Sequence, residues 1–212
     1  MNEIEDQIKW DEYLIEGTNT LKNKLNITDP DKLKEAESLI VRKKLAYLYL
    51  NPIEGDFDKN HLCTIHNFIF NEIYYFAGEL RNCSMQKETM FMLPDDINKN
   101  LELVLKQMNE DFDNNEINSV AEFAFKLAPH YYNLVYVHPF REGNGRCIRT
   151  FIRDFVIEKS KNKLCGPLDL DYTKIDKENL LMGTSRRYIY PSMLEVEFMK
   201  GLVSLEKNKN KM

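Results

Sequence analysis

The sequence predicts a single all-α domain that contains one small β-hairpin. Apolar residues recur every three or four positions through most of the chain, which is typical of amphipathic helices. Residues 79–93 lose this period and interrupt the helical pattern. The length of 212 residues allows one sizeable core, whereas two full domains would be cramped. We therefore expect residues 1–212 to fold as one domain.

The first helix is expected over residues 31–50, where apolar side chains alternate with lysine and glutamate at helical spacing. Asn51 and Pro52 end this helix, because a residue before proline disfavours helical backbone angles. Asp58 is a suitable N-cap for the next helix, since its short side chain can accept a hydrogen bond from a free backbone N–H. Apolar residues continue at helical spacing from there to Ile73.

Residues 79–93 are interpreted as an extended, hairpin-like flap near residues 80–93, which ends at Pro94. Beyond it, the helical period returns in the segments 95–109, 119–136, 148–156, 176–182 and 191–205. The core is expected within about residues 25–160. The helices over about residues 170–206 follow this core and are candidate regulatory elements.

Composition and charge exclude several classes of protein. The 29 basic and 34 acidic residues give a net charge of −5, so no overall positive field favours nucleic acid. No segment approaches the roughly 20 apolar residues of a membrane span. Four scattered cysteines without a Cys-x-x-Cys pair indicate reduced thiols. With an acidic N-terminus that lacks a secretory signal, we expect a cytoplasmic protein, and export as an effector is the alternative left open.

One short segment combines the groups needed to bind a polyphosphate and to deprotonate a hydroxyl. It reads His138-Pro139-Phe140-Arg141-Glu142-Gly143-Asn144-Gly145-Arg146, followed by Arg149. Histidine accepts a proton near neutral pH, so His138 is a candidate general base. Glu142 is a hard oxygen ligand in a suitable position for Mg²⁺ that bridges phosphates. Phe140 is expected to point inward and anchor the loop.

The glycines of this segment predict an anion-binding turn. Gly143 and Gly145 tolerate positive φ, so successive backbone N–H groups can converge on one point. The helix that begins at about Asn144 adds its unpaired N–H donors and the positive end of its dipole. Arg146 and Arg149 are three residues apart, so they share one helix face and can bind different phosphates.

The segment resembles the signature of the Fic (filamentation induced by cAMP) domain proteins, His-x-Phe-x-(Asp/Glu)-Gly-Asn-Gly-Arg-x-x-Arg. Eight defined positions match: His138, Phe140, Glu142, Gly143, Asn144, Gly145, Arg146 and Arg149. Tyr75-Phe76-Ala77-Gly78-Glu79-Leu80-Arg81 also resembles the family's lead into its flap. The resemblance covers about residues 25–160.

This resemblance implies a protein adenylyltransferase that uses ATP and Mg²⁺ to transfer AMP to a Tyr, Thr or Ser hydroxyl of a protein. His138 would deprotonate the hydroxyl, and Glu142 would hold Mg²⁺. Gly143, Asn144 and Gly145 would bind the α- and β-phosphates. Arg146 and Arg149 would engage the phosphate chain, with Arg149 nearest the γ-phosphate.

The resemblance also implies how a target would bind. The flap would pair with the backbone of the target as an added strand, with Lys87 and Phe91 as candidate contacts. Tyr188 and Tyr190 are candidate sites of self-modification. The sequence leaves the assembly state open, with a homodimer as one candidate, and it indicates no nucleic-acid or membrane partner.

Many members of the family carry an inhibitory helix with the pattern (Ser/Thr)-x-x-x-Glu-(Gly/Asn), whose glutamate pairs with the second arginine of the signature. In the last predicted helix, Ser192 is followed by Glu195, which is close to this pattern but out of register. Our hypothesis is that Glu195 reaches Arg149 and inhibits the enzyme. An N-terminal segment containing Glu35 is the alternative.

Two other functions remain as alternatives to AMP transfer. The chain could transfer another phosphate-containing group, or it could be a catalytically quiet module that binds nucleotide or protein. The intact Gly143-Asn144-Gly145-Arg146 sequence favours AMP, because it leaves room for an α-phosphate at the reacting position.

Overall fold

The computed structural model describes residues 3–87 and 90–205 and confirms a mainly helical domain. Its elements in chain order are α1 (Glu3–Glu12), α2 (Pro30–Leu50), α3 (Lys59–Phe70), α4 (Pro94–Asp113), α5 (Val120–Val137), α6 (Asn144–Ser160), β1 (Leu168–Leu170), the 3-10 helix η1 (Tyr172–Lys174), α7 (Lys177–Ser185), α8 (Met193–Gly201) and β2 (Leu202–Ser204).

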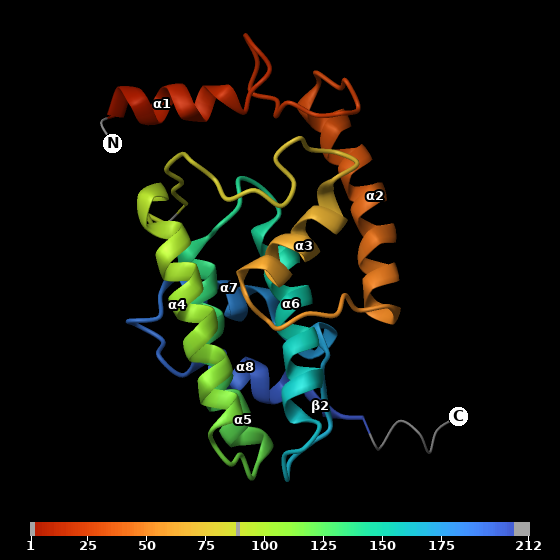
Figure 1. Ribbon diagram of the computed structural model, residues 1–212, viewed down its shortest axis with the longest axis vertical. Coiled ribbons are helices and arrows are strands. Elements are labelled where there is room, and N and C mark those ends of the chain that lie inside the picture. Colours follow the sequence, from red (N-terminus) through yellow and green to blue (C-terminus); the bar gives the residue numbers. More distant parts are fainter. Residues whose placement is uncertain (1–2, 88–89, 206–212) are drawn as a thin grey trace.

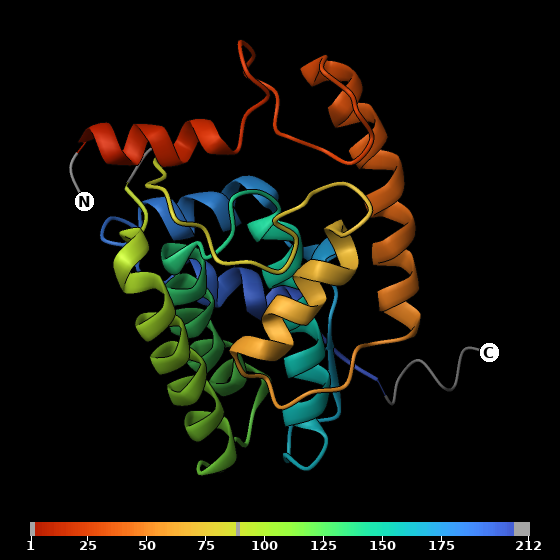
Figure 2. The same cartoon turned by 45° about the horizontal axis from the view of Figure 1, so that its top comes forward.

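Helices α5 and α6 form the centre of the domain (Figures 1 and 2). Helix α5 packs against α4, α6, α7 and α8, and helix α6 packs against α3, α5 and β1. Apolar residues at helical spacing on α5, such as Phe123, Leu127 and Leu134, are fully buried. The loop that joins α5 to α6 carries the signature, so this loop is attached to two core helices.

Side-chain caps explain why several helices begin where the sequence predicts. Asp58 accepts a hydrogen bond from the His61 N–H at 2.8 Å, and Ser119 accepts one from the Glu122 N–H at 3.1 Å. Each cap satisfies a backbone donor that has no partner within its own helix. Helix α1 was not expected, because it has no buried residue and hence no apolar stripe.

The two-stranded sheet lies in the C-terminal region, where no strand was predicted. Strands β1 and β2 are antiparallel, with Leu168 opposite Ser204 and Leu170 opposite Leu202. Three residues per strand are too few to produce a recognisable alternation. The expected flap is present with little regular structure, since among its described residues the hairpin is marked by one bridge, between Gln86 and Met90.

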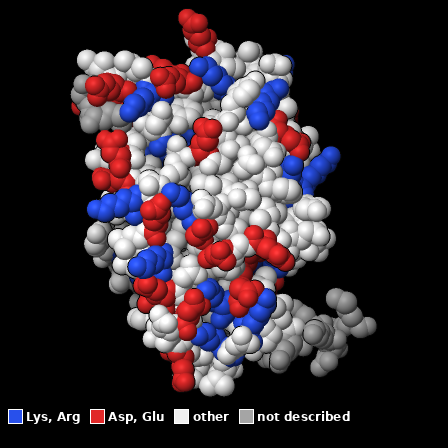
Figure 3. Space-filling model, viewed as in Figure 1, with Lys and Arg blue, Asp and Glu red and all other residues white. Residues whose placement is uncertain are grey.

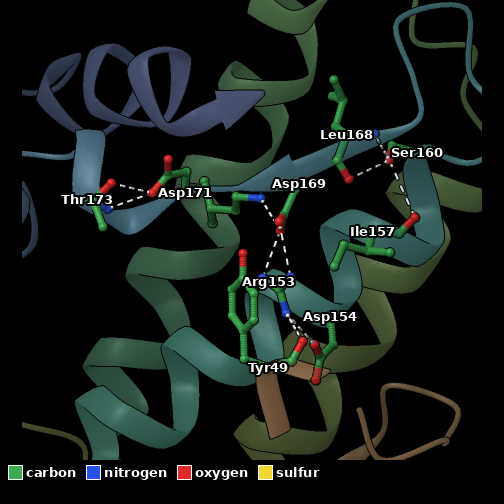
Figure 4. Close-up of polar contacts among 10 residues, drawn as sticks. Tyr49, Arg153, Asp154, Ile157, Ser160, Leu168, Asp169, Asp171 and Thr173 are labelled. Carbon is green, nitrogen blue, oxygen red and sulfur yellow. Dashed lines mark hydrogen bonds and ion pairs between the residues drawn. The ribbon is translucent and has the colours of Figure 1, made fainter. Parts of the chain in front are cut away.

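A buried ionic cluster joins α6 to β1 and therefore ties the C-terminal region to the core (Figure 4). The Arg153 guanidinium donates from its terminal nitrogens to Asp169 at 3.0 Å and to the Tyr49 carbonyl at 3.3 Å, and its Nε lies 2.8 Å from the other Asp169 oxygen as an ion pair. It also stacks on the Tyr49 ring. Asp154 lies 3.8 Å from Arg153, which is too long for a hydrogen bond.

The surface carries both signs of charge. On the face seen in Figure 3, acidic and basic side chains are interspersed and form no continuous basic stripe. In the described part of the chain, no helix is both long and apolar enough to cross a membrane.

Asp154 predicts a pH dependence of stability. Burial raises the pKa of its carboxyl from 3.8 to about 7, and both of its oxygens lack hydrogen-bond partners. The folded state thus favours the protonated acid, and this stabilisation is lost as the pH rises through about 7. We expect Asp154→Asn to gain stability relative to the wild type between pH 4 and pH 8, by at most about 4 kcal/mol. Urea unfolding of both proteins over this range measures the difference, and parallel pH profiles would contradict the prediction.

Candidate active site

His138 ends helix α5 and turns the chain into the signature loop. Its backbone is left-handed, with φ 47° and ψ 61°, and its N–H donates to the Leu134 carbonyl at 3.1 Å. Positive φ is uncommon for residues other than glycine. The C-terminal end of α5 therefore fixes where the His138 side chain begins.

The His138 imidazole is neutral and one of its nitrogens is left available. Its Nδ1 lies 3.3 Å from the Val135 carbonyl, so this nitrogen carries the proton and Nε2 has a free lone pair. Burial lowers the pKa of His138 to about 3, and the positive charge of Lys87 acts in the same direction. The Phe91 ring stacks on the imidazole, with centroids 3.7 Å apart. The flap residues Lys87 and Phe91 therefore do lie at His138.

The flap is joined to the signature loop by Arg81. This side chain is 2% exposed, and its guanidinium donates to the carbonyls of His138 at 2.7 Å, Cys83 at 2.6 Å and Met92 at 2.6 Å. Its backbone N–H donates to Pro139 at 2.9 Å. Cys83 and Met92 lie in the two stems of the flap, so one cation fixes both stems beside the histidine.

The loop is closed by Asn144 and anchored by Phe140. The Asn144 side-chain oxygen accepts from the Phe140 N–H at 2.9 Å, and its amide nitrogen donates to the Phe140 carbonyl at 2.6 Å. Phe140 is fully buried, as the sequence predicts. Both polar atoms of the Asn144 side chain make these hydrogen bonds, so only its backbone N–H is left as a candidate donor to phosphate.

His66 supports the loop from α3. Its Nδ1 accepts from the Gly78 N–H at 2.8 Å, so its Nε2 donates to the Glu142 carbonyl at 2.9 Å. Its ring stacks on Phe140, and burial lowers its pKa to about 4, which keeps it neutral. No local pattern in the sequence identifies His66 as part of the site, because its partner Glu142 is distant in the chain.

The glycine turn opens the N-terminus of α6 toward an anion. Gly143 has φ 81°, and a β-carbon there would overlap the Phe70 ring. Gly145 was also expected at positive φ, but it lies within the first turn of α6. Helix α6 begins without a side-chain cap, so its first N–H groups are available to phosphate oxygens.

Glu142 and Arg146 form an ion pair at the turn. The Glu142 carboxylate is 42% exposed, and its Oε1 accepts from the Gly143 N–H at 2.8 Å and from Arg146 at 3.1 Å. The other terminal nitrogen of Arg146 pairs with Glu37 of α2. Glu142 therefore presents a partly exposed oxygen, while both terminal nitrogens of Arg146 are already engaged.

Arg149 has a different environment from Arg146. Its guanidinium lies over Gly145 and close to Tyr131. Burial raises the pKa of the Tyr131 phenol, and the positive charge of Arg149 offsets part of this rise. In the described ranges, no carboxylate lies within ion-pair distance of Arg149. Its positive charge is therefore available to a phosphate.

The two residues proposed to inhibit the site do not reach Arg149. Glu195 pairs with Arg187 at 3.1 Å, because both lie in the α7–α8 region. Glu35 is exposed on α2. The acid that does contact the signature is Glu37, which was not predicted. A signal existed, since Glu37 interrupts the buried row of Leu33 and Val41 at intervals of four residues.

Helix α1 lies across the flap (Figure 2) and was also not predicted as part of the site. Asp6 accepts a hydrogen bond from the Ser84 N–H at 2.7 Å, and the Tyr13 hydroxyl accepts one from Asn82 at 3.3 Å. The Trp10 ring covers Arg141, with 3.9 Å between the guanidinium carbon and the ring centroid. The N-terminal helix thus contacts both the flap and the signature loop.

Several known proteins are similar to this chain in sequence. Residues 56–156 match the Fic/DOC family. The chain is 29% identical over 148 residues to a probable protein adenylyltransferase Fic of Escherichia coli, which covers 69% of this chain and 72% of that protein. It is 25% identical over 179 residues to the protein adenylyltransferase VbhT of Bartonella schoenbuchensis, but these cover 84% of this chain and 36% of VbhT. This chain thus spans about a third of VbhT.

The structure is also similar to BepC, a VirB-translocated effector of Bartonella tribocorum that was crystallised with AMPPNP. The TM-score is 0.77 at 27% identity, and the match covers 92% of this chain and 97% of that one. The family match runs from the loop before α3 into α6, and so encloses the flap and the signature together. Residues 56–156 of this chain therefore form a domain of the Fic/DOC family.

Proposed function

We propose that this chain is a protein adenylyltransferase that transfers AMP from ATP to a side-chain hydroxyl of a protein. One observation carries the proposal: a neutral histidine with a free Nε2 precedes an uncapped helix N-terminus whose Arg149 has no carboxylate partner among the described residues. The histidine supplies a base, and the helix end with Arg149 supplies a site for phosphates.

In the proposed reaction, His138 Nε2 takes the proton of the target hydroxyl as its oxygen attacks the α-phosphorus. The new bond joins this oxygen to phosphorus, and the bond between the α-phosphorus and the bridging oxygen breaks. Pyrophosphate leaves with that electron pair. The first N–H groups of α6, which have no side-chain cap, and Arg149 would stabilise the negative charge on the phosphates.

Glu142 is the residue that we propose to hold Mg²⁺. The described residues contain no cluster of three or more His, Cys, Asp or Glu side chains suited to a metal. This fits Mg²⁺, which commonly binds one or two protein carboxylates and takes its remaining ligands from phosphates and water. When bound, the ion neutralises charge on the leaving pyrophosphate.

We propose that the target lies along the flap, where Lys87 and Phe91 would contact it. Support comes from the position of both residues at His138, since a bound target must bring its hydroxyl to that imidazole. Tyr188, which is 98% exposed, is the candidate for self-modification. We place the protein in the cytoplasm, in keeping with its four free cysteines, and export is the alternative.

His138→Ala is expected to lower AMP transfer by about 10²–10⁴-fold, because the variant loses its general base. The measurement is incorporation of label into protein from ATP radiolabelled at the α-phosphate, with γ-labelled ATP in parallel. His130→Gln is the matched control, since His130 lies on the same helix but binds Asp111 of α4.

Label from the α-position alone agrees with AMP transfer. Label from the γ-position alone contradicts it and indicates phosphate transfer instead. If neither position labels protein while the wild type still binds ATP, the chain is a catalytically quiet nucleotide-binding module.

The low pKa of His138 predicts activity that persists at acidic pH. An ordinary histidine is protonated below about pH 6.5, whereas His138 remains a neutral base until about pH 3. We expect Phe91→Ala to admit water to the imidazole and raise its pKa, so the acidic limb of the profile moves to higher pH. Initial rates from pH 5 to 8 measure this effect.

Met90→Ala is the control for this profile, because Met90 is an exposed neighbour in the same flap. Titration of ATP itself affects all three proteins equally. A profile of Phe91→Ala that coincides with that of the wild type would show that the Phe91 ring does not set the protonation of His138.

A further inference from the structure

We propose that Glu37 and Tyr74 are positioning residues, which orient Arg146 and, through it, the Glu142 carboxylate. Both lie outside the signature, on α2 and just beyond α3. The inference rests on the proposed function, because it assigns Arg146 to Glu142 and leaves the phosphates mainly to Arg149 and the N-terminus of α6.

The Glu37 carboxylate is fixed at both of its oxygens. One oxygen accepts a hydrogen bond from the Tyr74 hydroxyl, and the other pairs with a terminal nitrogen of Arg146. Tyr74 is 2% exposed and the Glu37 side chain is 13% exposed. Burial and the charge of Glu37 raise the pKa of Tyr74, so its hydroxyl stays protonated and remains a donor.

Arg146 is held as firmly as Glu37. Its two terminal nitrogens contact Glu37 and Glu142, and its guanidinium lies over the Phe70 ring, with 4.9 Å from the central carbon to the ring centroid. A planar guanidinium between two carboxylates and above an aromatic ring has one favourable orientation. Its charge is balanced by the two carboxylates, so it adds little attraction for a phosphate.

Glu142 is the residue that benefits from this arrangement. Its side chain is 42% exposed and its Oε1 is held by Arg146 and by the Gly143 N–H. Orienting partners of a metal-binding carboxylate typically change metal affinity by about 10–100-fold. The chain of contacts from Tyr74 through Glu37 and Arg146 therefore fixes a carboxylate that would otherwise move freely in water.

A competing role for Glu37 predicts the opposite result. If Glu37 withholds Arg146 from ATP, its removal frees a cation and tightens nucleotide binding. If Glu37 positions Arg146, its removal weakens the Mg²⁺-dependent part of binding. The sign of the effect therefore separates the two roles.

The test measures binding of the nonhydrolysable analogue AMPPNP by calorimetry during a titration with Mg²⁺. For Glu37→Gln, we expect the Mg²⁺ concentration at half-maximal enhancement to rise about 10-fold. Affinity for AMPPNP without Mg²⁺ should change less than about 2-fold, since Arg149 and α6 are intact. Glu35→Gln is the matched control, because it makes the same change at an exposed position of the same helix.

Tyr74→Phe is the second variant, which keeps the buried ring and removes the one hydroxyl that fixes Glu37. It should shift the Mg²⁺ requirement in the same direction by a smaller factor. Combining Tyr74→Phe with Glu37→Gln should give less than the sum of the two effects, because both act through one chain of contacts. This variant also tests the proposal if Glu37→Gln does not fold.

An unchanged Mg²⁺ requirement in the folded variants overturns the inference, and so does tighter binding or faster AMP transfer. These outcomes are distinguishable from failure of the proposed function. If the wild type transfers no AMP, the proposed function fails, whereas the binding titration still decides whether Glu37 and Tyr74 position Glu142.

Discussion

The arrangement of the site depends on the buried guanidinium of Arg81. It binds carbonyls from the end of α5 and from both stems of the flap, although these segments lie far apart in the sequence. A buried cation requires such partners, because an unpaired charge away from water is costly. Burial lowers the pKa of Arg81 to about 10, which still leaves it charged at neutral pH. Since these carbonyls have no competing solvent, the flap is held at a fixed distance from His138.

Burial keeps two histidines of the site neutral, and their hydrogen bonds give the two residues different roles. His66 and His138 are both neutral, but His66 uses both of its nitrogens within the protein and His138 leaves one free. The same desolvation therefore makes one histidine a structural link and the other a candidate base. The two arginines of α6 differ in a similar way, because Arg146 faces two carboxylates and Arg149 faces none among the residues described.

Local patterns in the sequence were sufficient for the helices from α2 onward and for the signature loop. Asp58 could be identified as a cap because a cap acts within one turn of its own helix. The strands β1 and β2 could not be predicted from the sequence, because three residues are too few to show an alternating pattern. Most of what could not be predicted is contact between residues far apart in the chain. Glu37 pairs with Arg146 across more than a hundred positions, and the spacing of residues does not encode this pairing. For the same reason, Glu195 was given the wrong arginine as its partner.

Phe70 connects the packing of the core to the shape of the glycine turn. Its ring is fully buried, packs beside His66, supports the Arg146 guanidinium and excludes any side chain at Gly143. A change of ring size there alters packing density and the shape of the anion turn in the same step. A substitution that reshapes this turn must therefore also repack this part of the interior, which couples any change at the turn to thermodynamic stability.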